Sequence, residues 1–163
     1  MTNTGSSPSS RRTYADRLLL ASRLTEPAIR AAVAALDPPP ASKGLDAGCG
    51  AGLHARWLAE RIGTEGRVIG LDQSGDNLME ARRLARADPA GRRVEFVQGD
   101  LHHPPFEAAS FDWVWCADTL WPVPGVDPVA GLAGLRRVVR PGGTVALVFW
   151  SNQSLLAGHP ELE

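Results

Sequence analysis

Residues 45–52, with the sequence Leu-Asp-Ala-Gly-Cys-Gly-Ala-Gly, decide the fold. The segment 43–47 predicts a short strand that runs into this stretch, and apolar residues at helical spacing follow it. Gly48, Gly50 and Gly52 let the backbone turn sharply and let a ligand approach without meeting a Cβ atom. The amino terminus of the following helix offers free N–H groups and the positive end of a helix dipole. A strand, a glycine turn and a helix in this order predict a ligand-binding turn at the end of a buried strand.

The alternation of strand and helix continues along the chain. Ser74 and Asp127 are placed to cap two further helices, and Leu132 should face the core from the second of them. Ahead of the glycine turn, residues 14–24 predict one short helix and Thr25 is expected to cap another. This pattern is typical of an α/β fold with a doubly wound parallel sheet and right-handed crossovers. Further strands are expected at 67–71, 94–97, 111–116 and 144–150.

Composition excludes several classes of protein. The chain has 163 residues, a formal net charge of −1 and 44% hydrophobic residues, which predicts a single domain with its own core. The balanced charge argues against nucleic-acid binding, which usually requires a basic excess. Two cysteines cannot form a disulfide scaffold, and no apolar run reaches the length of a membrane helix. We therefore expect a cytoplasmic protein with reduced thiols, and the single lysine among 17 basic residues indicates a GC-rich, bacterial gene.

A second acidic residue indicates the kind of ligand. Asp72 follows the next predicted strand, where a carboxylate can accept hydrogen bonds from both hydroxyl groups of a ribose. The glycine turn and this acid together predict an adenosine-type cofactor. The fingerprint of dinucleotide-binding proteins would place a small residue at position 53, where this chain has Leu53. A nicotinamide-dependent oxidoreductase is therefore the less favoured alternative.

Motifs spread over residues 43–150 resemble those of class I S-adenosylmethionine-dependent methyltransferases, above all the small-molecule enzymes of ubiquinone and menaquinone biosynthesis. The glycine stretch has the Gly-x-Gly-x-Gly spacing of that family's first motif. The resemblance implies a Rossmann-like sheet of strand order 3-2-1-4-5, the cofactor S-adenosyl-L-methionine and the product S-adenosyl-L-homocysteine. The later motifs match in order at 68–74 (Val-Ile-Gly-Leu-Asp-Gln-Ser), 96–101 (Phe-Val-Gln-Gly-Asp-Leu), 105–112 and 135–143.

The resemblance also implies roles at the methionine end of the cofactor. Gly48, Gly50 and Gly52 would pass along the methionine part. Asp46 would orient the ammonium group through a water molecule. The main-chain carbonyl of Cys116 would accept a hydrogen bond from the same ammonium group.

At the adenosine end, the resemblance implies four further contacts. Asp72 would hold the ribose hydroxyl groups, with Gln73 beside the adenine. Asp100 would approach the amino group on the adenine edge, and Leu101 would meet the adenine face. Methyl transfer needs no dedicated base, so no catalytic residue is assigned.

Other residues near this site suggest the acceptor and exclude a metal. His102 and His103 lie in a loop with no convincing metal-ligand spacing, so we expect solvent-exposed histidines and no metal site. Trp121 is expected to line the acceptor site. Residues 117–120 replace the Asn-Pro-Pro-aromatic tetrapeptide that accompanies methylation of amides or exocyclic amines in protein or nucleic acid. A small-molecule acceptor, and no nucleic-acid partner, is the expectation.

The carboxyl-terminal region departs from the family pattern of seven strands. The residues after Trp150 are too few to supply strands six and seven, so strand five would have an exposed apolar edge. We therefore expect a chain that lacks its C-terminal part, or one that self-associates through this edge. A catalytically silent cofactor-binding module is the main alternative function. The expected divisions are a disordered tail (1–12), a helical segment (13–41), the cofactor-binding core (42–150) and a truncated segment (151–163).

Overall fold

The computed structural model describes residues 14–120 and 127–149. These residues form a five-stranded sheet in the order β3-β2-β1-β4-β5, and every neighbouring pair is parallel. The predicted fold class and strand order are therefore confirmed. The strands are β1 (Lys43–Ala47), β2 (Arg67–Asp72), β3 (Val94–Gln98), β4 (Phe111–Ala117) and β5 (Val139–Val148).

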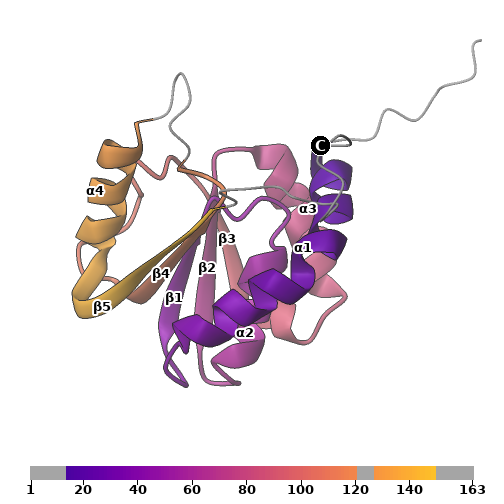
Figure 1. Ribbon diagram of the computed structural model, residues 1–163, viewed down its shortest axis with the longest axis horizontal. Coiled ribbons are helices and arrows are strands. Elements are labelled where there is room, and N and C mark those ends of the chain that lie inside the picture. Colours follow the sequence, from indigo (N-terminus) through magenta and orange to yellow (C-terminus); the bar gives the residue numbers. More distant parts are fainter. Residues whose placement is uncertain (1–13, 121–126, 150–163) are drawn as a thin grey trace, which may run out of the picture.

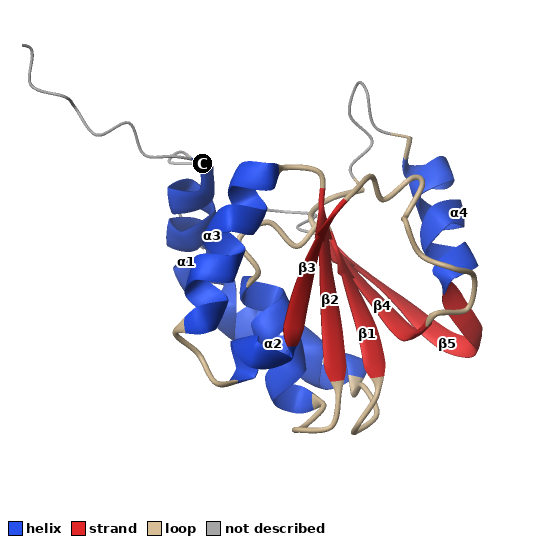
Figure 2. Ribbon diagram, turned by 180° about the vertical axis from the view of Figure 1, so that it is seen from behind, coloured by secondary structure: helices blue, strands red, loops and turns tan. Residues whose placement is uncertain are grey.

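Helices lie on both faces of the sheet. Figures 1 and 2 show α1, α2 and α3 on one face and α4 on the other. Successive residues of β4 serve the two cores in turn, because side chains alternate along a strand. Trp113 and Trp115 pack under α1–α3, whereas Val114 and Cys116 face α4. The helices are α1 (Tyr14–Leu36), α2 (Leu53–Arg61), α3 (Gly75–Arg86) and α4 (Pro128–Val138), with a 3-10 turn η1 (Ala90–Arg93).

A glycine in β1 makes room for the largest buried side chain. A Cβ atom at Gly44 would lie 2.0 Å from the ring of Trp113, which is 1% exposed. The indole Nε1 of Trp113 donates a hydrogen bond of 2.8 Å to Oγ of Ser42. The indole N–H therefore has a hydrogen-bond partner although the ring is buried, and the ring packs in the core near the amino end of β1.

Helix α1 is continuous, and the predicted boundary at Thr25 is wrong. Pro27 lies inside the helix, and the hydroxyl of Thr25 donates to the carbonyl of Ser22 (3.5 Å) instead of capping a new helix. Proline removes one backbone donor, which is why a helix break was expected. The helix continues because Ile29 and Val33, 2% and 4% exposed, pack in the core shared with α2.

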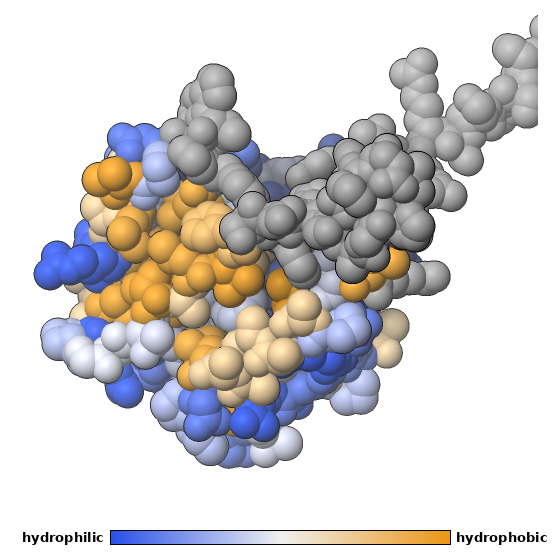
Figure 3. Space-filling model, in the orientation of Figure 1, coloured by the Kyte–Doolittle hydropathy of each residue, from blue (hydrophilic) through white to orange (hydrophobic). Residues whose placement is uncertain are grey.

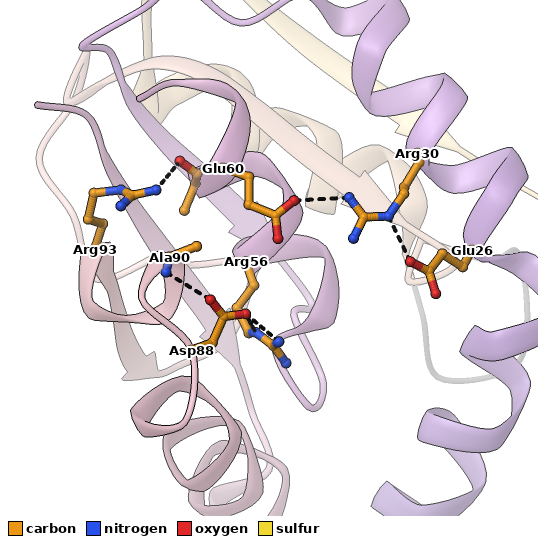
Figure 4. Close-up of polar contacts among 8 residues, drawn as sticks. Glu26, Arg30, Arg56, Glu60, Asp88, Ala90 and Arg93 are labelled. Atoms are coloured by element: carbon orange, nitrogen blue, oxygen red, sulfur yellow. Dashed lines mark hydrogen bonds and ion pairs between the residues drawn. The ribbon is translucent and has the colours of Figure 1, made fainter. Parts of the chain in front are cut away.

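Polar contacts join α1, α2 and the segment before η1 (Figure 4). Arg30 bridges Glu26 (2.7 Å) within α1 and Glu60 (3.0 Å) on α2. Nε of Arg56 donates to Asp88 at 2.9 Å, which links α2 to the chain entering β3. The two pairs of Arg30 are exposed and contribute little stability, so we attribute the placement of α1 mainly to its buried apolar residues.

Strand β5 begins earlier than predicted. The strand was expected at 144–150, but β5 starts at Val139 directly after α4 and shifts register against β4 between Phe111 and Trp113. The end of the predicted strand, at Trp150, lies outside the described residues.

An apolar patch lies over α4 and β5. Leu132 is 41% exposed, so the expectation that it faces the core is wrong. It lies on the outer side of α4 because Leu135 and Val138 already fill the contact with the sheet. Figure 3 shows apolar residues gathered on this side of the molecule. The patch consists of Val129, Leu132, Leu147 and Phe149.

None of the helices within 14–120 and 127–149 has the length and apolar character needed to span a membrane.

Candidate cofactor site

The glycine turn has the conformation that its residues predict. Gly48, Gly50 and Gly52 have φ values of 79°, 52° and 75°, a region that other residues rarely adopt. The backbone N–H groups of Gly48 and Cys49 donate to the carbonyl of Leu71 at 2.7 and 2.9 Å. The turn is therefore fastened to the carboxyl end of β2, and Gly52 is the residue from which α2 begins.

The protein itself crowds two of these glycines. A Cβ atom at Gly48 would lie 2.2 Å from Oγ1 of Thr119, and one at Gly52 would lie 2.7 Å from the ring of Phe96. Side chains are therefore excluded by packing as well as by backbone conformation. Thr119, which follows β4, thus lies beside the turn, and sequence analysis missed it because no local pattern links the two segments.

Asp72 connects the glycine turn to the start of α3. Its Oδ2 accepts a hydrogen bond from the backbone N–H of Gly50 at 2.8 Å. Its Oδ1 accepts from the backbone N–H of Ser74 (2.8 Å) and from Nδ2 of Asn77 (3.3 Å). Each carboxylate oxygen has two lone pairs, so Oδ2 keeps one for a ligand hydroxyl group. Ser74 caps α3 as predicted, by accepting from the N–H of Asn77.

Asp46 is a buried acid near the carboxyl end of β1. It is 1% exposed, and its Oδ2 has no hydrogen-bond partner within the described part of the chain. The pKa of this carboxyl group is raised to about 8, mainly by burial; a backbone hydrogen bond from Ala55 lowers it and the charge of Asp72 raises it, both to a smaller extent. A buried carboxyl oxygen without a partner is costly, so this position favours a ligand that brings a donor or a positive charge.

Asp100 follows β3 and is held by its neighbours. Its Oδ1 lies 2.7 Å from Nδ1 of His102 and accepts a second hydrogen bond, of 2.9 Å, from the backbone N–H of the same residue. Both contacts lower the pKa of the Asp100 carboxyl group, the backbone contact most. His103 is exposed as expected, but the side chain of His102 is only 22% exposed. The expectation of two solvent-exposed histidines is therefore wrong for His102.

The other predicted contacts lie around this end of the sheet. Gln73 is exposed, and its carbonyl accepts from Nε2 of Gln98 at 3.0 Å. Leu101 packs against the core on the α4 side. Cys116 is buried in that core, where burial raises its thiol pKa to about 12. Cys49 belongs to the core on the opposite face, and both cysteines are free.

A neutral histidine lies beside the turn, in the first helical residues of α2. The ring of His54 stacks on Trp57, with centroids 5.4 Å apart, and its Nδ1 accepts from Nε1 of Trp115 at 3.4 Å. Burial lowers the pKa of His54 to about 4. No role was assigned to His54 from the sequence. Its partner Trp115 lies 61 residues further along the chain, and its other partner, Trp57, belongs to the same helix.

The structure therefore gathers the predicted residues at the carboxyl ends of β1, β2, β3 and β4. Trp121, the predicted acceptor contact, lies outside the described residues. Within the described part of the chain, no group of three or more potential ligands is placed to hold a metal ion.

These residues fit S-adenosylmethionine. Asp46 offers an unsatisfied acceptor, and it lies next to the glycine turn along the chain. The sulfonium and ammonium groups of this cofactor are positively charged, whereas the pyrophosphate of a dinucleotide is an anion. Two carboxyl groups close to the turn, Asp46 and Asp72, favour the cation.

Comparisons with known proteins agree with this site. Residues 45–143 match the family described as "Methyltransferase domain". The chain is 41% identical over 130 residues to an uncharacterized 37.1 kDa protein in transposon TN4556 of Streptomyces fradiae, covering 79% of this chain and 36% of that protein. It is 37% identical over 111 residues to demethylmenaquinone methyltransferase of Lactococcus lactis, covering 68% and 43%.

A solved structure has the same fold. A SAM-dependent methyltransferase from Aquifex aeolicus superimposes with a TM-score of 0.73 at 22% identity, over 83% of this chain and 71% of that one. The chain spans less than half the length of the two sequence relatives above. From the family match over most of the sheet and the glycine turn, we conclude that this chain belongs to the methyltransferase domain family.

Proposed function

We propose that this chain binds S-adenosyl-L-methionine, and that the protein it belongs to transfers the methyl group to a small-molecule acceptor and releases S-adenosyl-L-homocysteine. The observation that carries the proposal is the unpartnered carboxyl oxygen of Asp46 beneath the glycine turn. Family membership supports the same cofactor. A relative named demethylmenaquinone methyltransferase supports a small acceptor.

We assign the methionine end of the cofactor to the turn. Gly48, Gly50 and Gly52 would border it, Asp46 would orient the ammonium group through water, and the carbonyl of Cys116 would accept from that group. The buried position of Asp46 supports this, since its charged form needs a nearby cation.

We assign the adenosine end to the loops after β2 and β3. Asp72 would accept from the ribose hydroxyl groups through the free lone pair of Oδ2, with Gln73 beside the adenine. Asp100 would accept from the adenine amino group, and Leu101 would contact the ring. Asp72 is already fixed by three hydrogen bonds, which lowers the entropy lost when ribose binds.

Methyl transfer from a sulfonium donor does not require a dedicated catalytic base. When bound, the cofactor supplies a methyl group on a sulfonium sulfur; the acceptor's lone pair forms the new bond, the carbon–sulfur bond breaks, and its electron pair stays on sulfur. Positive charge is dispersed during this displacement, so the residues of the chain contribute by positioning the reactants and excluding water. No catalytic residue is assigned.

Isothermal titration calorimetry tests the cofactor. We expect S-adenosylhomocysteine to bind the chain and NADH not to bind. Preference for NADH would overturn the methyltransferase proposal in favour of an oxidoreductase. Binding of S-adenosylhomocysteine without turnover of any acceptor by the full protein would instead support the silent cofactor-binding alternative.

We also propose that a second copy of the chain covers the outer edge of β5. No described strand pairs with this edge, and the apolar patch continues from it onto α4. Sedimentation velocity should detect a dimer that Leu147→Lys weakens. Met79→Lys, which alters an apolar residue 66% exposed on α3, is the matched control and should leave the dimer intact. A monomer at all concentrations contradicts the proposal.

We propose a cytoplasmic location in a bacterium. The two free cysteines and the single lysine among 17 basic residues support it. Fractionation of source cells tests it. We retain the division into an amino-terminal helical segment at 13–41, a cofactor-binding core at 42–150, and flanking segments 1–12 and 151–163, both of which lie outside the described residues.

A further inference from the structure

The loop after β3 is fastened to the start of α4 through one histidine. Nε2 of His102 lies 3.1 Å from the carbonyl oxygen of Asp127, and its Nδ1 lies 2.7 Å from Oδ1 of Asp100. The Asp127 carbonyl also accepts the N–H of Gly131 at 3.0 Å, the first turn of α4. His102 therefore connects the acid assigned to adenine with the residue that caps α4.

Both ring nitrogens of His102 face acceptors. A neutral imidazole carries one N–H group, so its second nitrogen would present a lone pair to an oxygen lone pair. Only the doubly protonated ring donates to the carboxylate and to the carbonyl at once. The ring of His102 therefore lies between two oxygen acceptors and connects them.

The bridge decides which oxygen of Asp100 is available. Oδ1 accepts from the ring and from the backbone N–H of His102, which occupies both of its lone pairs. Oδ2 has only the exposed ring of His103 nearby, at 3.6 Å. Oδ2 is thus the oxygen left for a ligand, held in one orientation by the contacts to Oδ1.

The loop and α4 form one packed unit around the bridge. A Cβ atom at Gly134 would lie 2.7 Å from the carbonyl oxygens of residues 101 and 102, so the helix approaches the loop directly. Nη2 of Arg137 donates to the carbonyl of Pro104 at 2.6 Å, and its Nη1 donates to that of Phe106 at 2.8 Å. The carboxylate of Asp127 accepts from the N–H groups of residues 129 and 130. The charged groups of Asp127 and Arg137 are therefore engaged elsewhere, and Asp100 is the charge that His102 meets.

We propose that His102 is a positioning residue for adenine recognition: its ring bridges Asp100 and the carbonyl of Asp127, and so holds Asp100 in the orientation in which Oδ2 accepts from the adenine amino group. The proposal rests on the assignment of Asp100 to the adenine. It predicts that the affinity for an adenosine ligand depends on a residue that acts through Asp100 and not by contact with the cofactor.

The test compares His102→Gln with His103→Gln by calorimetry with S-adenosylhomocysteine at a fixed pH of 5.5. Wild type and His103→Gln should bind with similar affinity. His102→Gln cannot hold the bridge, so its affinity should be roughly ten-fold weaker, as for one lost charge-assisted hydrogen bond. Asp46 is unchanged in all three proteins, so its contribution cancels in the comparison.

A second ligand separates positioning from a merely structural role. S-inosylhomocysteine has an oxygen in place of the adenine amino group, so wild type at pH 5.5 should bind it more weakly than S-adenosylhomocysteine. His102→Gln should lose most of this discrimination, while His103→Gln should keep it.

The outcomes are distinct. If wild type binds no S-adenosylhomocysteine, the proposed function fails and this inference fails with it. If wild type binds but His102→Gln keeps the wild-type affinity and discrimination, the inference alone is overturned.

Discussion

Asp46→Asn is expected to make the unliganded protein more stable at pH 8 and to remove a pH dependence that wild type shows. Burial raises the folded-state pKa of Asp46 to about 8, whereas an unfolded aspartate titrates near 3.8. The folded state therefore holds a proton that the unfolded state has released. The free energy of unfolding falls as pH rises from about 4 to about 8, by roughly 1 kcal/mol per pH unit for this group.

His54 acts in the opposite direction over a different range. Burial lowers its folded-state pKa from 6.5 to about 4, so its contribution to stability is lost as pH falls below about 6.5. Between about pH 6.5 and pH 8 only the Asp46 effect of this pair remains. Denaturant unfolding in that window isolates it.

The control variant, like Asp46→Asn, loses one carboxyl group. Glu107→Gln removes one carboxylate from an exposed loop and should keep the wild-type slope. Asp46→Asn should be nearly flat, because asparagine is neutral and keeps an oxygen for the N–H of Ala55. Parallel slopes for wild type and Asp46→Asn would show that this carboxyl group is ionised and satisfied in the unliganded protein.

Asp72→Ala is expected to weaken binding of S-adenosylhomocysteine by ~1–3 kcal/mol, or roughly 5- to 150-fold in Kd. The variant removes the proposed ribose contact. It also removes the acceptor that holds the N–H of Gly50, so the glycine turn loses one of its anchors. Titration calorimetry at fixed pH measures the change.

Asp76→Ala is the control for this second prediction. Asp76 is an exposed acid in the first turn of α3, so its removal changes the local charge without touching the turn. Its Kd should stay near the wild-type value. Unchanged affinity in Asp72→Ala, with an intact fold by circular dichroism, would show that the ribose contact is misassigned.

Local signals explain what sequence analysis predicted well. Gly48, Gly50 and Gly52 require positive φ, and each has it. Ser74 and Asp127 cap their helices because a side-chain oxygen reaches N–H groups only two or three residues ahead. These features depend on neighbours along the chain, which the sequence displays directly.

Other features depend on neighbours in space. Helix α1 continues through Pro27 because its buried face packs in the core shared with α2, and Leu132 is exposed because other residues of α4 fill the sheet contact. His102 was expected in solvent, but Asp127 meets it from a segment 25 residues away. No local pattern reports such contacts.

By itself, the sequence determined the α/β class and the placement of a glycine turn beside two acids, because hydrophobic periodicity and glycine chemistry act over short distances. The strand order was predicted from the resemblance of the motifs to those of a known family. Only the tertiary structure decided the state of those acids. Asp46 is left with an unpartnered oxygen, Asp72 is tied to the turn, and Asp100 is held by a histidine. Burial and hydrogen-bond partners set the charge and orientation of a carboxyl group, and both arise only when distant segments pack together.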